Sequence, residues 1–265
     1  MKSAFVITDL EGTAGVTSFT EEAYADAKYL DRARRLATAE LNAAVEGLLA
    51  VGVADILVWD GHGAGGLWYE DLHPAVRLIH GRPSPPISVI AGVVDGYEAG
   101  IIIGQHAMAG VASSNMNHTQ SSTHIDHITL NGQRIGEIAQ SALFWGAAGM
   151  PFVFLSGEQA ACDEAVRLIP GIGTAAVKQG LGRGSAISVS ASEARNRITA
   201  GISRAAEHHR AHPIPPTVWD APYVLEKRFF HTDAADASAA APGAERVDGQ
   251  TVRFHGDDIR SVIYR

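Results

Sequence analysis

The sequence predicts an α/β fold, with a mostly parallel sheet flanked by helices and a smaller C-terminal α+β lobe. Short apolar runs typical of buried strands alternate with stretches of helical periodicity over most of the chain. Three prolines, Pro213, Pro215 and Pro216, then interrupt this alternation, and a tail of β-forming residues follows. We therefore expect an α/β metal-binding domain over residues 1–180 and a C-terminal lobe over residues 181–265.

The α/β alternation can be followed element by element. Five short apolar runs predict buried strands: Ala4–Thr8, Ala54–Trp59, Gly100–Gly104, Pro151–Leu155 and Thr174–Val177. Helical spacing and capping patterns predict four helices: Leu30–Val51, Gly136–Gly149, a helix opened by the Ser156 capping box and running to Leu168, and one from Ser190 to about His209. Ile128–Ile135 is expected to form a hairpin, because Asn131-Gly132 suits a tight turn between strands.

Two of the helices begin with apparent capping patterns. Ser156-Gly157-Glu158-Gln159 and Ser190-Ala191-Ser192-Glu193 both fit a capping box. After the prolines, the composition predicts strands over three segments and one short alanine-rich helix. The strand segments are Thr217–Leu225, Thr251–Phe254 and Ser261–Tyr264, and the helix is Ala234–Ala241.

The composition excludes several classes of protein. With 21 basic and 29 acidic residues, a net charge of −8 and a pI near 5.8, neither a nucleic-acid partner nor a polybasic membrane surface is expected. One cysteine, Cys162, rules out a disulfide framework and a cysteine-based zinc site. No apolar run reaches the roughly 18–20 residues of a membrane span. The short apolar stretch after Met1 runs directly into acid, unlike a signal peptide. We therefore expect a cytoplasmic globular protein.

Ionisable side chains follow three of the predicted strands where each strand ends. Asp9 and Glu11 follow the first strand, His62 the second and His106 the third. Because the carboxyl ends of parallel strands share one edge of a sheet, we expect these side chains to converge. Glu137, at the start of the next predicted helix, would add another carboxylate. Taken singly, each residue is more often a cap or a satisfied polar group, but their coincidence favours a metal site.

Mixed carboxylate and imidazole ligands suit zinc best, and manganese or iron less well. Five such groups exceed the ligand set of one tetrahedral zinc, so they indicate two metals sharing a bridging carboxylate. A competing motif, G-x-G-x-x-G at Gly61–Gly66, is weak because no strong helix opens behind it. His118 lies in a polar segment soon after His106, where it is either an ordinary loop histidine or an acid–base group.

These residues resemble, in order, the D-aminopeptidase family of dinuclear zinc peptidases, the DppA-like enzymes. The resemblance covers nearly the whole chain and is carried by eight segments: Asp9–Gly12, Asp60–His62, Leu72–Pro74, Gly104–Ala107, Met116–His118, Gly136-Glu137, Leu168–Pro170 and Thr174–Gln179. Two loops depart from the family pattern. Ala107–Asn117 is slightly long and Gln179–Ser185 carries extra glycines, so we expect both to line the substrate pocket.

The resemblance implies two zinc ions per subunit and a catalytic role for His118. The implied ligands are Asp9, Glu11, His62, His106 and Glu137, with Asp9 as the bridge. We expect Glu11 and Glu137 to complete one metal site, and His62 and His106 the other. The family also implies a two-domain subunit in a ring-shaped homo-oligomer, a decamer, whose active sites face an inner chamber.

The predicted function is a zinc-dependent hydrolase of amide or peptide bonds, an aminopeptidase that releases N-terminal D-amino acids from short peptides or amides. A metal-bridging hydroxide would attack the carbonyl, while His118 donates a proton to the leaving amine or acts as a nucleophile. One alternative is an amidase of the same scaffold acting on a small non-peptide amide, lactam or hydrazide. The other is a non-catalytic module that binds a small ligand, although burying so many ionisable groups without metal is costly.

Overall fold

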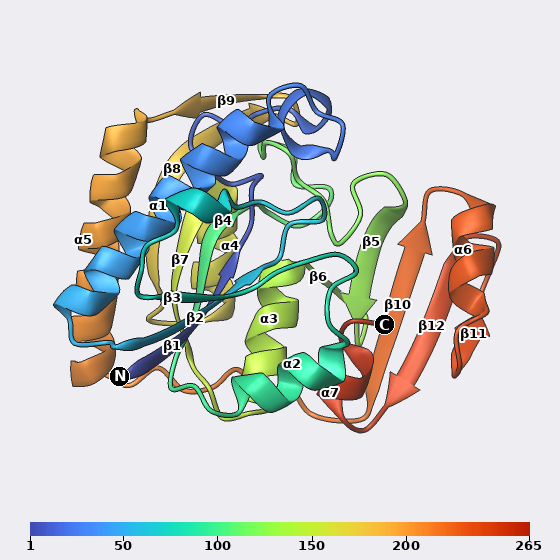
Figure 1. The fold of residues 1–265 in the computed structure, drawn as a ribbon. Helices are drawn as coiled ribbons and strands as arrows, with labels where there is room; N and C mark the ends of the chain where they lie inside the picture. The colour runs from blue at the N-terminus through green and yellow to red at the C-terminus, as the bar shows by residue number, and fades with distance from the viewer.

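The computed structural model describes residues 1–265 and contains two sheets beside each other (Figure 1). The larger, sheet A, has seven strands, and all neighbours in it run parallel except the last pair. Its order reverses between β1 and β4, which is where open α/β sheets bind ligands. Across the sheet the strands are β3 (Val76–Ile79), β2 (Asp55–Asp60), β1 (Ser3–Thr8), β4 (Gly100–Gln105), β7 (Phe152–Glu158), β8 (Gly173–Gly182) and β9 (Ser185–Ser188).

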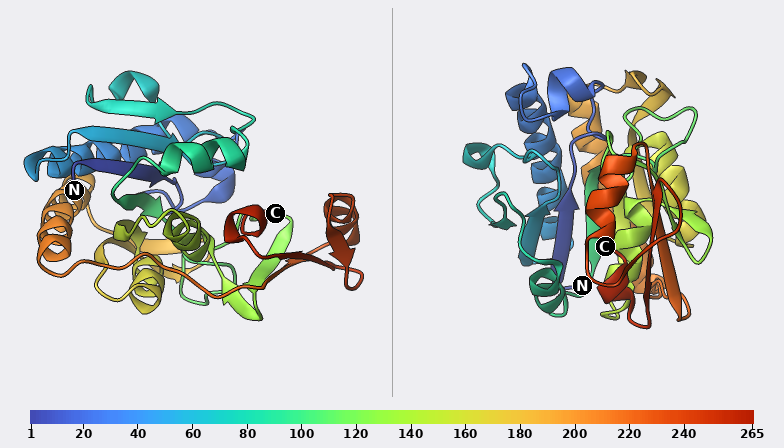
Figure 2. Two further views of the ribbon diagram at one scale, coloured as in Figure 1. Left: turned by 90° about the horizontal axis from the view of Figure 1, so that it is seen from below. Right: turned by 90° about the vertical axis from the view of Figure 1, so that its right-hand side faces the viewer.

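Helices cover both faces of sheet A, so β4 and β7 at its centre are buried throughout and mainly apolar (Figure 2). On one face α1 (Leu30–Ala50) packs against α5 (Ala191–Ala211), and on the other α3 (Glu137–Gly146) packs against α4 (Gln159–Leu168). Between β3 and β4 the chain forms α2 (Ile87–Val94). None of the helices combines the length and apolar character needed to cross a membrane.

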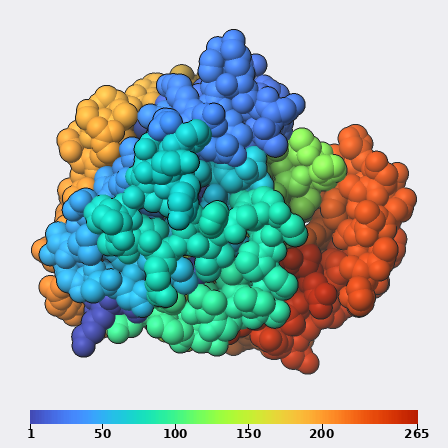
Figure 3. Space-filling model, in the orientation of Figure 1, coloured from blue at the N-terminus to red at the C-terminus, as the bar shows by residue number.

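Sheet B is antiparallel and has five strands. With the helices α6 (Thr232–Ala239) and α7 (Ile259–Val262), its C-terminal strands form the orange and red lobe of Figure 3. Asn131 and Gly132 have φ of +50° and +78°, as a type I′ hairpin turn requires. The strand order is β11 (Ala244–Arg246), β12 (Thr251–Gly256), β10 (Tyr223–Phe229), β5 (Ile125–Leu130) and β6 (Gln133–Ile135).

The predicted fold class is confirmed, with a mostly parallel sheet flanked by helices and a smaller α+β lobe. The two sheets are not separated by a single point in the chain, however. Residue 180 lies within β8, and α5 from beyond it packs on sheet A, whereas the β5–β6 hairpin from before it belongs to sheet B. One hydrophobic cluster of 54 buried residues runs through both sheets. The division into residues 1–180 and 181–265 therefore stays a prediction about folding units.

The strand predicted over Thr217–Leu225 is displaced, because β10 begins only at Tyr223. Two other local predictions were wrong. Ser156 does not cap a helix, because it lies inside β7, and α4 begins only after Glu158, which makes no side-chain cap. Ser261–Tyr264 is not a strand, because Asp258 caps α7 through Arg260 N–H and the chain coils there. By contrast, the Ser190 cap of α5 is confirmed, since its side chain accepts from Glu193 N–H at 3.3 Å.

Candidate metal centre

The centre begins where the ends of β1 and β4 meet. The N–H of Asp9 donates to a β4 carbonyl at 2.9 Å, so the pairing continues past the end of β1. Two glycines permit this contact. A Cβ on Gly12 would lie 2.1 Å from the carbonyl oxygen of Gln105, and a Cβ on Gly104 would lie 2.2 Å from that of Asp9. The glycines therefore bring Asp9 close to His106, which directly follows β4.

His62 reaches the centre on a tight turn after β2. Both carboxylate oxygens of Asp60 accept from Gly66 N–H, at 2.9 and 3.0 Å, and this closes the turn. The buried His62 ring donates from Nε2 to the carbonyl oxygen of Ala23 at 2.8 Å. Its Nδ1 lies 3.0 Å from Glu11 Oε2. Asp60 thus stabilises the turn, and the turn places the His62 side chain in the centre.

His106 and Glu137 form the opposite side of the centre. His106 is 2% exposed and donates from Nδ1 to the carbonyl oxygen of Ala107 at 2.9 Å. Its Nε2 lies 3.1 Å from Asp9 Oδ2 and 3.7 Å from Glu137 Oε2. Glu137 is the first residue of α3 and accepts from the N–H of Gln120 at 2.6 Å. All five predicted ligands therefore lie at one end of sheet A.

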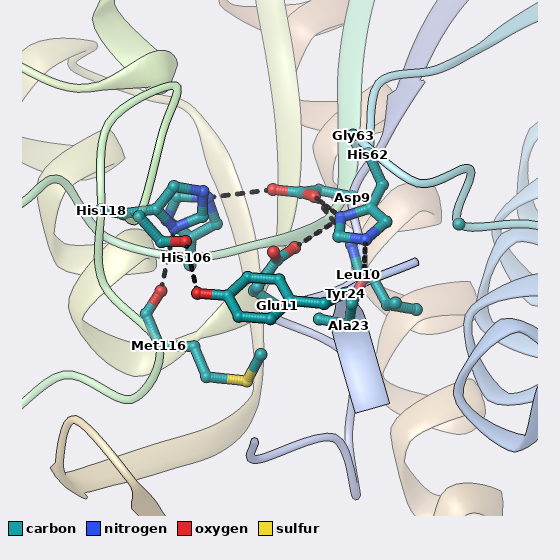
Figure 4. Close-up of polar contacts among 12 residues, drawn as sticks. Asp9, Leu10, Glu11, Ala23, Tyr24, His62, Gly63, His106, Met116 and His118 are labelled. Carbon is teal, nitrogen blue, oxygen red and sulfur yellow. Dashed lines mark hydrogen bonds and ion pairs between the residues drawn. The ribbon is translucent and has the colours of Figure 1, made fainter. Parts of the chain in front are cut away.

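The three histidines of the centre share one hydrogen-bonding arrangement (Figure 4). Each points one ring nitrogen at a backbone carbonyl, which can only accept, so that nitrogen carries the proton of the neutral ring. The other nitrogen then presents a lone pair to carboxylates, namely Nδ1 of His62 and Nε2 of His106 and His118. The His106 Nε2 atom is buried without a hydrogen bond. Lone pairs aimed at carboxylates fit a bound cation, and metal-binding histidines are commonly oriented this way.

The distances suit two metals on either side of Asp9. Asp9 Oδ1 lies 3.4 Å from His62 Nδ1, and Asp9 Oδ2 lies 3.1 Å from His106 Nε2. Ligand atoms on a tetrahedral zinc with bonds of about 2.0–2.1 Å are roughly 3.3 Å apart. His62 lies closest to Glu11, while ligand atoms of Asp9, Glu11 and His106 also lie within 4.8 Å of one another, so the expected pairing of the two glutamates stays a prediction. His62 and His106 lie on opposite sides of Asp9. The reason is topological, because β2 and β4 flank β1 on opposite sides.

Burial and mutual attraction set the protonation of these groups. Burial raises the pKa of Asp9, but the adjacent His106 and His62 rings outweigh it and hold that pKa well below its usual value. Burial lowers the pKa of His106, but Glu137 and Asp9 outweigh it and raise the pKa to about 10. The pKa of His62 also rises well above its usual value, because Glu11 and Asp9 outweigh the effect of burial. The carboxylates thus attract positive charge, which a metal ion would supply in place of protons.

His118 differs from the other two histidines in its surroundings. Its ring stacks on His106, with centroids 3.9 Å apart and an interplanar angle of 17°, and it meets the edge of Phe19 at 5.4 Å. Its Nε2 lies 3.9 Å from Glu137 Oε1. Burial and the neighbouring His106 lower the pKa of His118. A neutral imidazole beside the carboxylates is suited to exchanging a proton near neutral pH.

A cavity of about 640 Å³ opens over the centre. The rest of its wall includes residues 120–124 and the aromatic side chains of Tyr24, Trp59 and Tyr264. Neither Ala107–Asn117 nor Gln179–Ser185 lines it, contrary to expectation. These two loops pack on each other behind His118, where Met116 N–H donates to the Arg183 carbonyl at 2.9 Å. The predicted site residues in its wall are Asp9, Glu11, His62, His118 and Glu137.

One buried lysine behind the centre escaped the sequence analysis. Lys178 is 3% exposed, and its Nζ donates to the carbonyl oxygens of Glu11 and Val16 and, at 2.8 Å, to Asn115 Oδ1. It therefore ties the Glu11 loop to the segment that precedes His118. The available signal was a lysine within an apolar strand, since buried lysine needs oxygen partners.

The fold and the site together define an α/β protein with a carboxylate–imidazole centre at the switch point of its sheet. The family model described as D-aminopeptidase, peptidase M55, matches residues 1–264. The chain belongs to this D-aminopeptidase family, which confirms the resemblance noted in the sequence.

Two relatives extend this comparison. A D-aminopeptidase of Bacillus subtilis (strain 168) is 29% identical over 258 residues, covering 96% of this chain and 92% of the relative. A solved structure described as Zn-dependent D-aminopeptidase DppA from Bacillus subtilis, a self-compartmentalizing protease, superposes with a TM-score of 0.89. That comparison has 27% sequence identity and covers 98% of this chain and 94% of that chain.

Proposed function

We propose that this protein is a zinc-dependent hydrolase that releases N-terminal D-amino acids from short peptides or amides. The observation that carries the proposal is the arrangement of three imidazoles, each fixed by a backbone carbonyl, with their free nitrogens facing three carboxylates. This arrangement occurs in a chain that belongs to the D-aminopeptidase family over residues 1–264. The description of its structural relative as Zn-dependent supports zinc as the metal.

The proposed ligands flank Asp9, whose two carboxylate oxygens face opposite sides of the centre. Glu11 and His62 would hold one zinc, and His106 and Glu137 the other, with Asp9 shared; the same ligands also suit manganese. When bound, the metal pair supplies a nucleophilic hydroxide at neutral pH and polarises the scissile carbonyl.

His118 is the proposed acid–base residue. Its Nδ1 is committed to the Met116 carbonyl at 3.0 Å, so Nε2 is the atom that gains and loses the catalytic proton. The lowered pKa leaves this nitrogen unprotonated at neutral pH, ready to take a proton and then pass it to the leaving amine. Phe19 and His106 hold the ring between them, which fixes its orientation.

The cavity supports a small substrate. A volume of about 640 Å³ lies within the range of small-molecule sites, which suits a short peptide or aminoacyl amide and excludes a folded protein. The partner is therefore a small peptide or amide. The description of the relative as self-compartmentalizing supports a homo-oligomer, and we propose a ring-shaped decamer in the cytoplasm. Light scattering of the purified protein tests the assembly, because a monomer of 27.9 kDa would contradict it.

The decisive experiment is a matched substrate panel. D- and L-alanine amide, D-alanyl-D-alanine, L-alanyl-L-alanine and a non-peptide amide are incubated with enzyme that is zinc-loaded, chelated, or chelated and reloaded. We expect cleavage of the D-aminoacyl substrates alone, lost on chelation and restored by zinc.

Three outcomes would contradict this proposal in different ways. Cleavage restricted to the non-peptide amide would replace the substrate and leave an amidase with the same centre. Activity that persists after complete removal of metal would contradict the zinc mechanism. Two tightly bound metals with no cleavage of any substrate would contradict the hydrolase activity for this panel.

A further inference from the structure

A charged residue occupies a core position in sheet B. Along β10 the side chains alternate between a buried face, formed by Tyr223, Leu225, Lys227 and Phe229, and a half-buried face. Lys227 is 7% exposed on the buried face. Its cross-strand neighbours, Ile128 of β5 and Val252 of β12, are both fully buried and apolar. A lysine here breaks the alternation of an antiparallel sheet, and such exceptions are expected at functional positions.

The Lys227 ammonium group has one polar partner and no counter-ion. Its Nζ donates to the side-chain oxygen of Gln120 at 2.8 Å. Burial lowers the pKa of Lys227 to about 8, and no nearby carboxylate opposes that shift. The group is therefore still mainly protonated at pH 7. An ammonium has three donors, so two of them lack a protein acceptor.

Gln120 connects this lysine to the candidate metal centre. Its backbone N–H donates to Glu137 Oε1 at 2.6 Å, and its φ of +61° is unusual for a residue other than glycine. Since lysine can only donate, the Gln120 amide must present its oxygen to Lys227 and its NH₂ group elsewhere. That NH₂ group donates to no protein acceptor, and Gln120 lines the cavity.

The charge of the cavity indicates what this donor binds. No lysine or arginine lines the cavity, and the charged groups in its wall are carboxylates and imidazoles. Lys227, bound to the Gln120 side chain, is a buried cation that forms no ion pair with a protein carboxylate. Gln120 lies two residues after His118, so it lies on the side where the leaving amine is protonated.

We propose that Gln120, backed by Lys227, forms a subsite for the carboxylate of the residue that leaves during hydrolysis. This inference rests on the proposed aminopeptidase function and deepens it. The Gln120 NH₂ group donates to the substrate carboxylate, and Lys227 orients the amide and supplies the compensating charge. Lys227 is thus a positioning residue, and the enzyme prefers peptides with a free carboxylate after the scissile bond over simple aminoacyl amides.

The test compares two substrates that differ in that carboxylate. The quantity measured is kcat/KM for D-alanyl-D-alanine divided by kcat/KM for D-alanine amide. In Lys227→Met, whose side chain suits the apolar face, we expect this ratio to fall about ten-fold, mainly through KM for the dipeptide. Lys2→Met is the matched control, because it removes the same charge from an exposed position before β1. Zinc content and melting temperature verify that each variant is intact.

A second variant keeps the inference falsifiable if Lys227→Met folds poorly. Gln120→Glu still accepts from Lys227 but loses its NH₂ donor and adds a like charge, so the ratio should fall further. If Lys227 served only to hold the Gln120 loop against sheet B, Gln120→Glu would keep the wild-type ratio.

The inference and the proposed function fail in distinguishable ways. A ratio that stays within two-fold of wild type in both variants would overturn the subsite and leave the hydrolase activity intact. Wild-type enzyme that cleaves D-alanine amide but not D-alanyl-D-alanine would also overturn the subsite and leave the hydrolase activity intact. Wild-type enzyme that cleaves neither substrate would overturn both.

Discussion

The two sheets of this protein carry charge in different places. In sheet A the central strands are mainly apolar, and ionisable groups gather at or beyond their carboxyl ends, as Asp9 does after β1 and His106 after β4. In sheet B charged side chains lie along the strands on the outer face, where Arg253 pairs with Glu226 at 2.7 Å. Lys227 is the one buried charged residue in any strand of sheet B.

This difference follows from how each sheet is covered. Helices bury both faces of sheet A, so only the strand ends are free to hold chemistry, and parallel strands bring those ends together. Sheet B has one face toward the core and one toward solvent, so charges on its outer face stay hydrated and cost little free energy. A charge at the strand ends of sheet A is therefore expected to serve a ligand, whereas a buried charge in sheet B needs a separate explanation.

The largest expected effect comes from removing the carboxylate shared by both sides of the centre. Asp9→Ala should bind neither zinc tightly and should lose activity by roughly 10³-fold or more, because both metal positions depend on its oxygens. Zinc per subunit is measured by atomic absorption after dialysis, with circular dichroism as the folding control. Full zinc content in the folded variant would show that Asp9 is not the bridge.

His118→Ala tests whether the third imidazole belongs to the metal set or to the chemistry. We expect zinc content to stay at the wild-type level while kcat falls by about 10²–10⁴-fold, as for loss of a general acid–base group. The measurement combines metal analysis with steady-state kinetics on D-alanine amide. Because His118 Nε2 lies near Glu137, loss of one zinc per subunit would make it a ligand instead.

A matched pair of core substitutions tests whether the two sheets unfold as one unit. Leu155 in β7 and Leu225 in β10 are both fully buried in the shared core. Leu155→Ala and Leu225→Ala should each lower the free energy of unfolding by about 2–5 kcal/mol. Urea unfolding followed by fluorescence and circular dichroism should show single, coincident transitions. A separate early transition in Leu225→Ala alone would show that the C-terminal lobe is an independent unit.

The smallest expected effect concerns a buried acid of the sheet A layer outside the centre. Glu40 on α1 accepts from Ala14 N–H at 2.9 Å, its other oxygen has no partner, and burial raises its pKa from 4.5 to about 7. The folded protein thus keeps this proton to a higher pH than the unfolded chain, so wild-type stability falls as pH rises from 4.5 to 7.

Glu40→Gln keeps the hydrogen bond and cannot ionise, so it should escape this loss. Relative to wild type, the variant should gain roughly 3 kcal/mol in the free energy of unfolding between pH 4.5 and pH 8. Denaturant titrations at both pH values measure the difference, with the exposed Glu207→Gln as control. An equal response in both variants would show that Glu40 carries no raised pKa.

Local patterns predicted most of sheet A and the convergence of the five candidate ligands, whereas the role of His118 came from the resemblance to the family. The strands were recognisable because buried parallel strands are continuous apolar runs, and Asp9, Glu11, His62 and His106 because they closely follow those runs. The capping box at Ser156 failed because the pattern also fits a buried strand, and β7 continues through it. The short β3 and α2 were missed because they lie near Gly81, Pro83, Pro85 and Pro86, which hide their periodicity.

The sequence by itself determined the alternation of strands and helices, the end of each strand and the chemical nature of the six site residues. These properties depend on neighbouring residues, through hydrophobic period and turn chemistry. Only the tertiary structure placed His62 Nδ1 3.0 Å from Glu11 and His106 Nε2 3.7 Å from Glu137, and joined the β5–β6 hairpin to the C-terminal strands. It alone brought Lys227 to Gln120, across 107 residues of chain. Such contacts depend on which strands become neighbours, and that is set by packing of the whole core.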